Sequence, residues 1–208
     1  DLPRRREEYV LRAGSAPLLV RTETWTYARS ADAAGVPLRT CTHTSVHGAD
    51  ASLPPAVDSR TEYPEGDYAV PAHLRGRVLS ETDADGVTTT TAWERGDWNA
   101  GTRAFAPAAG GAFLRATSLR SRGEATDKTY AVEVSELSRR LVVHSETCLA
   151  ADDSVLEWTS SAYDDVGRLR SRLYSDGTSE TNAYSCCRLL WSRDRRGRKV
   201  LRSARTGS

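Results

Sequence analysis

The sequence has little of the large aliphatic material from which compact domains build their cores. Its 208 residues include no Met and no Ile, only 2 Phe, and 36 residues that are Leu, Val or Phe. This share lies below the roughly 20% that warns of disorder when net charge is also high. The formal net charge is only +1, however, and 8 Tyr and 5 Trp add large side chains that suit half-buried strands. We therefore expect an ordered chain whose core is thin and spread along its length.

Several functional classes leave no mark on the sequence. No apolar run approaches the ~18 residues of a transmembrane helix, no signal peptide is visible, and no nucleophile elbow, HExxH motif or phosphate loop is present. A net charge near zero provides no general basic field for nucleic acid. We expect no enzyme, no cofactor and no membrane span. Because the chain begins at Asp1 without Met, we also expect it to be processed or incomplete.

Two segments of the sequence align without a gap. Residues 76–93 read GRVLSETDADGVTTTTAW, and residues 167–184 read GRLRSRLYSDGTSETNAY. The alignment matches the Gly-Arg pair, the Asp-Gly pair and the aromatic residue that ends each segment. A weaker third copy begins at Cys187 and reaches its turn glycine, Gly197, over the same spacing of ten positions. Tyr163 and Tyr184 lie 21 residues apart, which is the apparent repeat length.

Each copy has the composition of a β-hairpin. Asp85-Gly86 and Asp176-Gly177 are typical of a tight type I′ turn, which needs positive backbone dihedrals. The run 87–93 is rich in β-branched residues and ends in an aromatic residue, as strands do. A single hairpin is marginal in water, so each unit needs neighbours. We expect an all-β fold, an array of antiparallel β-hairpin repeats that forms a curved, open sheet.

The regularity of this pattern divides the chain into four parts. Residues 1–75 are expected to be a degenerate region of strands and loops, and residues 76–94 a hairpin. Residues 95–120, which are rich in Gly and Ala, are expected to be a loop inserted between hairpins. Residues 121–208 are expected to hold further repeat hairpins, clearest over 163–200.

The four cysteines are candidates for covalent or metal chemistry. Their number permits long-range disulfides in an oxidising compartment, but no C-x₂-C zinc pattern is present. A bridge between adjacent residues is strained, which argues against a regular disulfide within Cys186-Cys187. Small buried thiols at a repeat turn are the simplest interpretation. The disulfide state of Cys41, Cys148, Cys186 and Cys187 stays open.

Two polar clusters also need an interpretation. Cys41, His43 and His47 share one face of a strand and are possible zinc ligands, but no fourth ligand is evident, so an ordinary polar strand face is favoured. Aspartates beside glycine are more typical of residues that cap their own turns than of paired catalytic carboxylates. These aspartates are Asp83, Asp85, Asp164, Asp165 and Asp176.

The stretch Arg188–Arg205 carries a run of basic residues with Asp194 as its only acidic residue. Such a run is able to attract phosphates. A solvated hairpin edge, where charge prevents edge-to-edge aggregation, is the favoured interpretation. Nucleic acid is therefore not an expected partner.

The clearest repeat resembles a known family. It reads Tyr163-Asp164-Asp165-Val166-Gly167-Arg168-Leu169, followed by Asp176-Gly177 and Tyr184, and resembles the YD-repeat signature of RHS proteins. The resemblance covers about 60 residues. It departs from the signature in the third copy, where Tyr184-Ser185 replaces Tyr-Asp and Cys187 replaces the glycine.

The resemblance implies a structural segment of a secreted or cell-surface protein. In that family, hairpins can wrap into a hollow shell around a toxin or effector segment, which would be the partner. Association of YD-repeat proteins with cell walls implies the alternative of a carbohydrate-binding or adhesion module. Some RHS proteins carry an aspartyl self-cleavage motif rich in Asp-Pro-x-Gly, which this sequence lacks. The sequence predicts no catalytic, cofactor-binding or metal-binding residue, and leaves ligand-binding residues unknown.

Overall fold

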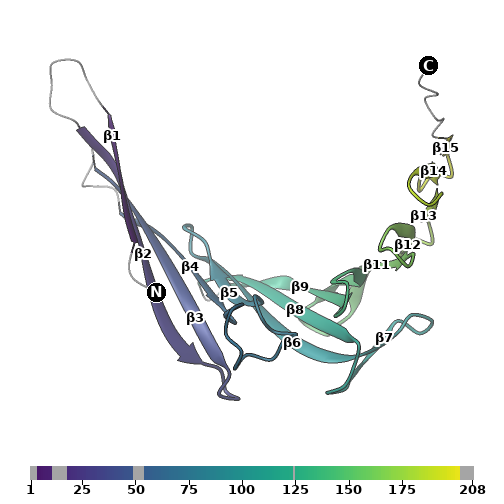
Figure 1. Cartoon of the computed structure of the whole chain (residues 1–208), viewed down its shortest axis with the longest axis horizontal. Coiled ribbons are helices and arrows are strands. Elements are labelled where there is room, and N and C mark those ends of the chain that lie inside the picture. The colour runs from purple at the N-terminus through teal and green to yellow at the C-terminus, as the bar shows by residue number, and fades with distance from the viewer. Residues whose placement is uncertain (1–3, 11–17, 49–53, 124, 202–208) are drawn as a thin grey trace. The chain divides into compact units, whose positions relative to one another are not determined.

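The computed structural model describes residues 4–10, 18–48, 54–123 and 125–201, and it is built of strands and turns (Figure 1). These residues contain no helix, and so none that is long and apolar enough to cross a membrane. The strands are β1 (Arg4–Val10), β2 (Leu18–Ala31), β3 (Pro37–His47), β4 (Ala56–Glu62), β5 (Val78–Thr82), β6 (Val87–Asn99), β7 (Ala104–Pro107), β8 (Phe113–Arg122), β9 (Ala125–Glu136), β10 (Val142–Leu149), β11 (Val155–Tyr163), β12 (Leu169–Tyr174), β13 (Ser179–Tyr184), β14 (Leu189–Arg193) and β15 (Lys199–Leu201).

The strands follow one another in the sheet almost in chain order. The path of hydrogen-bonded neighbours runs from β1 to β15, and only β7 lies off it, paired with β6. The pairs flanking the clearest repeat, β11 with β12 and β12 with β13, are antiparallel. Because the path has two ends, the sheet is open. The predicted all-β fold of antiparallel hairpins in an open sheet is confirmed.

The chain divides into two compact units. The first comprises residues 1–92 and 118–127, and the second comprises residues 93–117 and 128–208. The largest fully buried side chains are Val70 in the first unit, and Leu114 and Val134 in the second. The apolar core is therefore small in each unit, and backbone pairing between strands carries much of the order.

The turn glycines occupy the positions that the repeat alignment predicts. Gly86 lies between β5 and β6, Gly177 between β12 and β13, and Gly197 between β14 and β15. Their φ values are 77°, 78° and 77°. This left-handed region is one that glycine adopts without the steric penalty of a Cβ atom.

The predicted type I′ geometry of these turns is wrong. Asp85 and Asp176, which precede two of the glycines, do not have positive φ. Instead, the Gly86 N–H donates to the Asp83 carbonyl (3.0 Å), and the Asp83 N–H donates to the Val87 carbonyl (2.9 Å). This is the pattern of a three-residue loop, in which a type I turn is followed by one left-handed residue that forms a bulge.

The expected loop over residues 95–120 is largely strand. It contains the end of β6, all of β7 and most of β8. A Cβ atom at Gly96 would overlap the carbonyl oxygen of Ala106 on β7, and one at Gly111 would overlap the backbone of Gly96. The glycines that suggested a loop therefore permit close approach between backbones.

The first 75 residues are more regular than expected. β2 and β3 pair from Arg21 with His47 to Ala31 with Pro37 without a register shift. Threonine and charged residues occupy much of both strands, which hides the usual alternation of apolar and polar residues.

We predict that Gly177→Ala destabilises the protein by about 1 to 2 kcal/mol, because alanine is strained at positive φ. A Cβ atom there would meet no neighbour, so backbone strain alone is tested. Gly110→Ala is the matched control, since Gly110 has open space and no positive φ. The measurement is urea unfolding. Equal effects of the two substitutions would contradict the assigned turn geometry.

Candidate functional site

Two Ala-Tyr pairs take the same position in successive hairpins. Tyr163 ends β11 and Tyr184 ends β13, and the strand register shifts between Ala162 and Tyr163 and between Ala183 and Tyr184. A bulge of this kind re-aims the side chain beside it. As a result all four residues line one hollow.

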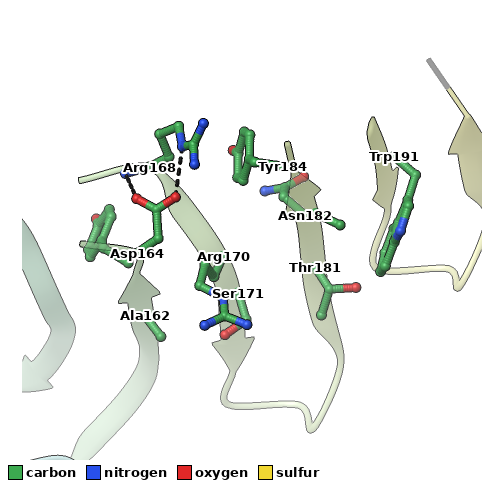
Figure 2. Close-up of a pocket in the computed structure, with 11 residues that line it drawn as sticks. Ala162, Asp164, Arg168, Arg170, Ser171, Thr181, Asn182, Tyr184 and Trp191 are labelled. Atoms are coloured by element: carbon green, nitrogen blue, oxygen red, sulfur yellow. Dashed lines mark hydrogen bonds and ion pairs between the residues drawn. The ribbon is translucent and has the colours of Figure 1, made fainter. Parts of the chain in front are cut away.

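This hollow, which we call the β11–β14 hollow, has a volume of about 600 Å³ (Figure 2). Its aromatic residues come from three strands, and its polar residues come from the strands and from the turn that follows β11. The lining residues are Ala162, Tyr163, Asp164, Arg168, Arg170, Ser171, Thr181, Asn182, Ala183, Tyr184 and Trp191.

The turn between β11 and β12 is closed by an ion pair. The Asp164 Oδ1 atom accepts the backbone N–H of Arg168 (2.8 Å), and Oδ2 accepts the Arg168 Nε–H (2.7 Å), as Figure 2 shows. Burial alone would raise the pKa of the Asp164 carboxyl, but the hydrogen bonds and the charge of Arg168 outweigh it and lower that pKa. Asp194 and Arg198 repeat both bonds, at 2.9 and 2.8 Å, in the turn between β14 and β15.

The same arginine also reaches the next turn on that side of the hairpins. Arg168 Nη1 donates to the carbonyls of Ser185 (3.0 Å) and Cys186 (3.2 Å). Its guanidinium carbon lies 4.5 Å from the centre of the Tyr184 ring. Arg168 therefore fixes its own turn and the following turn together, with charge-assisted hydrogen bonds and a cation–π contact.

Arg139 makes an equivalent link one turn earlier. It pairs with Glu136 through Nε (2.7 Å), and its Nη1 donates to the Asp164 carbonyl (2.7 Å). We call Arg139 and Arg168 the inter-turn arginines. Together they connect three alternate turns of the second unit, at 137–141, 164–168 and 185–188, which follow one another on one side of the hairpins.

The polar ends of several lining side chains are used within the sheet. The Tyr163 hydroxyl donates to the Val142 carbonyl (2.9 Å), and the Tyr184 hydroxyl donates to the Leu169 carbonyl (3.1 Å). Asn182 Nδ2 donates to the same Leu169 carbonyl (3.0 Å). The hollow therefore offers a ligand the faces of these two rings and of Trp191, beside the polar side chains of Arg170, Ser171 and Thr181.

The predicted turn-capping role is confirmed for three of the five aspartates. Asp83 Oδ1 accepts the Val87 N–H (2.9 Å), Asp176 Oδ1 accepts the Thr178 N–H (2.9 Å), and Asp164 acts as described above. Asp85 and Asp165 lie in the middle of the same turns.

Four of the turns share a simple spacing in the sequence that the repeat alignment does not use. Aspartate stands three residues before the turn glycine in D-x-x-G at positions 32–35, 83–86, 164–167 and 194–197. In each of these turns the aspartate Oδ1 accepts the N–H of the residue after the glycine. A search for this spacing assigns turn-closing roles to Asp32 and Asp194 as well.

One of the possible zinc ligands of β3, His43, has other partners. His43 Nδ1 lies 2.7 Å from Asp58 Oδ1, and the His43 ring stacks on Trp25 at 4.9 Å. Within the described ranges, no group of three or more His, Cys, Asp or Glu side chains is placed to hold a metal ion. Cys41 and His43 are thus parts of a polar strand surface.

The predicted burial of the cysteines is wrong for the adjacent pair. Cys148 is buried and Cys41 is half-buried, but Cys186 and Cys187 are both exposed, and all four are free thiols. The adjacent pair occupies the tip of a turn, where no neighbouring strand covers it.

Neighbouring side chains engage part of the basic stretch after Arg188. Arg195 Nη2 lies 2.6 Å from Asp176 Oδ2, and the Lys199 ammonium lies 4.5 Å from the centre of the Trp191 ring. Arg202 and Arg205 lie outside the described residues. The described part therefore resembles a charged hairpin edge more than a continuous phosphate-binding surface.

We predict that Arg168→Lys lowers the free energy of unfolding by about 2 kcal/mol. Lysine keeps the charge but cannot bond Asp164 and the two carbonyls at once. Arg170→Lys is the matched control, because this neighbouring exposed arginine has no assigned role in a turn. Urea unfolding followed by circular dichroism measures both. A loss no greater than the control's would show that the inter-turn bonds contribute little.

We also predict that stability falls in acid through the turn aspartates. The pKa of Asp164 is lower when folded than its ordinary value of 3.8. Its contribution is therefore complete above that value and is lost as pH falls through the folded pKa. Unfolding free energies at pH 6 and pH 3 should differ less in Asp164→Asn than in the wild type. An equal or larger difference in the variant would refute this assignment.

Comparison with known proteins assigns no family to this fold and site. No protein-family model matches the sequence, and no curated protein is similar to it. The proposal for its function must therefore come from the geometry of the hairpins and their turns.

Proposed function

We propose that this chain is a structural repeat segment of a secreted or cell-surface protein of the RHS/YD-repeat kind, and that it serves as a shell or scaffold around an effector segment. The observation that carries the proposal is the link between neighbouring turns on one side of the hairpins. Arg139 and Arg168 each close their own turn and bond a backbone carbonyl of the next. Such links suit an array whose units depend on their neighbours.

The chemistry of the β11–β14 hollow fits a scaffold better than an active site. Catalysis needs ionisable groups held ready for a substrate. Asp164 is instead occupied by Arg168, and the hydroxyls of Tyr163 and Tyr184 are donated to carbonyls. Asp164 thus closes its own turn, and the two tyrosines join neighbouring strands.

A surface carbohydrate-binding or adhesion module is the second candidate. The observation in its favour is the aromatic surface of the hollow, which Tyr163, Tyr184 and Trp191 provide together. Aromatic rings combine a large apolar area with a polar edge, which suits contact with sugar rings. Half-burial of all three side chains leaves part of each ring accessible.

The test uses the natural polypeptide that contains this chain, expressed whole and digested with proteinase K under native conditions. We expect the strands to resist digestion, and a second fragment of the polypeptide to elute with them in gel filtration. Trp191→Ala is the control for the hollow, and it should leave this co-elution unchanged.

The two functions give opposite results in this experiment. If the strands elute alone, and cell-wall oligosaccharides change the tryptophan fluorescence of the wild type but not of Trp191→Ala, the adhesion module is supported. The shell proposal is then wrong.

A further inference from the structure

The adjacent cysteines form the tip of the turn between β13 and β14. The Ser185 N–H donates to the Arg188 carbonyl (2.9 Å), which leaves Cys186 and Cys187 as the two residues at the tip. Both are exposed, and their Sγ atoms lie 3.1 Å apart, with the Cys187 thiol donating to the Cys186 sulfur. Two accessible thiols are therefore held side by side, within reach of reagents in solution.

A bridge between these thiols would be easily reduced. Consecutive Cα atoms lie about 3.8 Å apart across a trans peptide, whereas ordinary disulfides join Cα atoms about 4.4 to 6.8 Å apart. The resulting ring is strained, and strained, exposed disulfides are the labile ones. Such a bridge suits reversible chemistry better than permanent cross-linking.

We propose that Cys186 and Cys187 form a reversible redox site, at which a small-molecule disulfide oxidises the two thiols to a bridge between adjacent residues. This inference does not depend on the proposed shell function, because it rests on the geometry of one turn. The oxidant is any accessible compound of the class R–S–S–R, and the two thiols of the protein supply the electrons.

The thiol-to-thiol hydrogen bond assigns different roles to the two cysteines. Donation to Cys186 raises the pKa of the Cys187 thiol, and burial adds to this effect, while the charge of Arg168 opposes it. In this hydrogen bond the Cys187 thiol keeps its proton, and the Cys186 sulfur is the acceptor. Cys186 is therefore the attacking thiol, and Cys187 is the thiol that closes the bridge.

The reaction proceeds in two balanced exchanges. The Cys186 thiolate attacks R–S–S–R, forms a mixed disulfide with one sulfur and releases the other as RS⁻. The Cys187 thiolate then attacks the Cys186 sulfur, forms the bridge and releases the second RS⁻. Two protons pass from the cysteines to the released thiolates, so the small disulfide is reduced to two thiols.

Oxidation should also weaken the link to the preceding turn. Bridging moves the sulfurs from 3.1 Å to about 2.05 Å and constrains the peptide between the two residues. The carbonyl of Cys186 belongs to that peptide, and Arg168 Nη1 bonds it at 3.2 Å. The redox state of the turn is thereby coupled to an inter-turn arginine.

The test treats the reduced, folded chain with 2-hydroxyethyl disulfide and maps the products by mass spectrometry. In the wild type we expect the peptide that contains both cysteines to lose two hydrogens. In Cys187→Ser we expect a stable mixed disulfide at Cys186. In Cys186→Ser we expect several-fold slower reaction at Cys187. Cys148, which is buried, is the internal control and should stay reduced.

Two further measurements keep the proposal open to refutation. Phenylarsine oxide, which binds paired thiols with loss of water, should bind the wild type once at this turn and neither serine variant. The oxidised wild type should unfold at lower urea concentration than the reduced form, and this difference should shrink in Arg168→Lys. Mixed disulfides on both thiols without a bridge, or a bridge to Cys41 or Cys148, would overturn the proposal.

Discussion

The second unit depends on arginines that bind two turns at once. Each inter-turn arginine pairs with a carboxylate of its own turn and donates to a carbonyl of the next, as Arg168 does with Asp164 and Ser185. A guanidinium suits this task because its donors lie in a fixed plane and its charge is permanent. Since the strands between these turns are short and few apolar side chains are fully buried, the turns must hold the hairpins in register.

In the first unit a tyrosine, instead of an arginine, joins a turn to another segment. There the Tyr63 hydroxyl donates to Asp32 Oδ2 (2.9 Å), and so joins the turn after β2 to the segment after β4. Burial, followed by this bond and the charge of Asp32, raises the pKa of Tyr63 to about 12. Asp32 meanwhile caps its own turn through Oδ1. In the first unit, the second carboxylate oxygen of the turn aspartate bonds a distant segment directly. In the second unit, the same oxygen of Asp164 holds Arg168, which bonds the other turn.

Much of the fold could be predicted from the sequence, because turn chemistry is local. The spacing of Asp-Gly pairs located Gly86 and Gly177 at hairpin bends. The Asp-Gly pair alone does not determine the turn type. The type depends on which residues close the loop, as the Asp83 N–H does by donating to the Val87 carbonyl around Gly86. The β6–β7 strand pair was mistaken for a loop because Gly96 permits close backbone contact and does not mark a break.

The candidate site was harder to predict than the fold. Arg168 was visible as part of a motif, but its bonds to Ser185 and Cys186 join residues 17 and 18 positions apart. Arg139 reaches 25 positions to Asp164. Neither separation equals the apparent repeat of 21, so periodicity in the sequence does not reveal the link.

The turn that departs most from the repeat is also the one that depends most on its neighbour. The 185–188 turn has neither an aspartate at its start nor a residue with positive φ. Ser185 stands where the motif has Asp, and the turn is one residue shorter than the D-x-x-G turns and has no glycine. Its own side-chain bonds are long: the Arg188 N–H donates to Ser185 Oγ at 3.3 Å, and the Ser185 hydroxyl donates to the Arg188 carbonyl at 3.4 Å. The carbonyls that Arg168 holds therefore contribute more to this turn than to one closed by its own ion pair. Oxidation of Cys186 and Cys187 would therefore change a turn that has few hydrogen bonds of its own. Because Arg168 bonds this turn, the change would also reach the hairpin that contains Arg168.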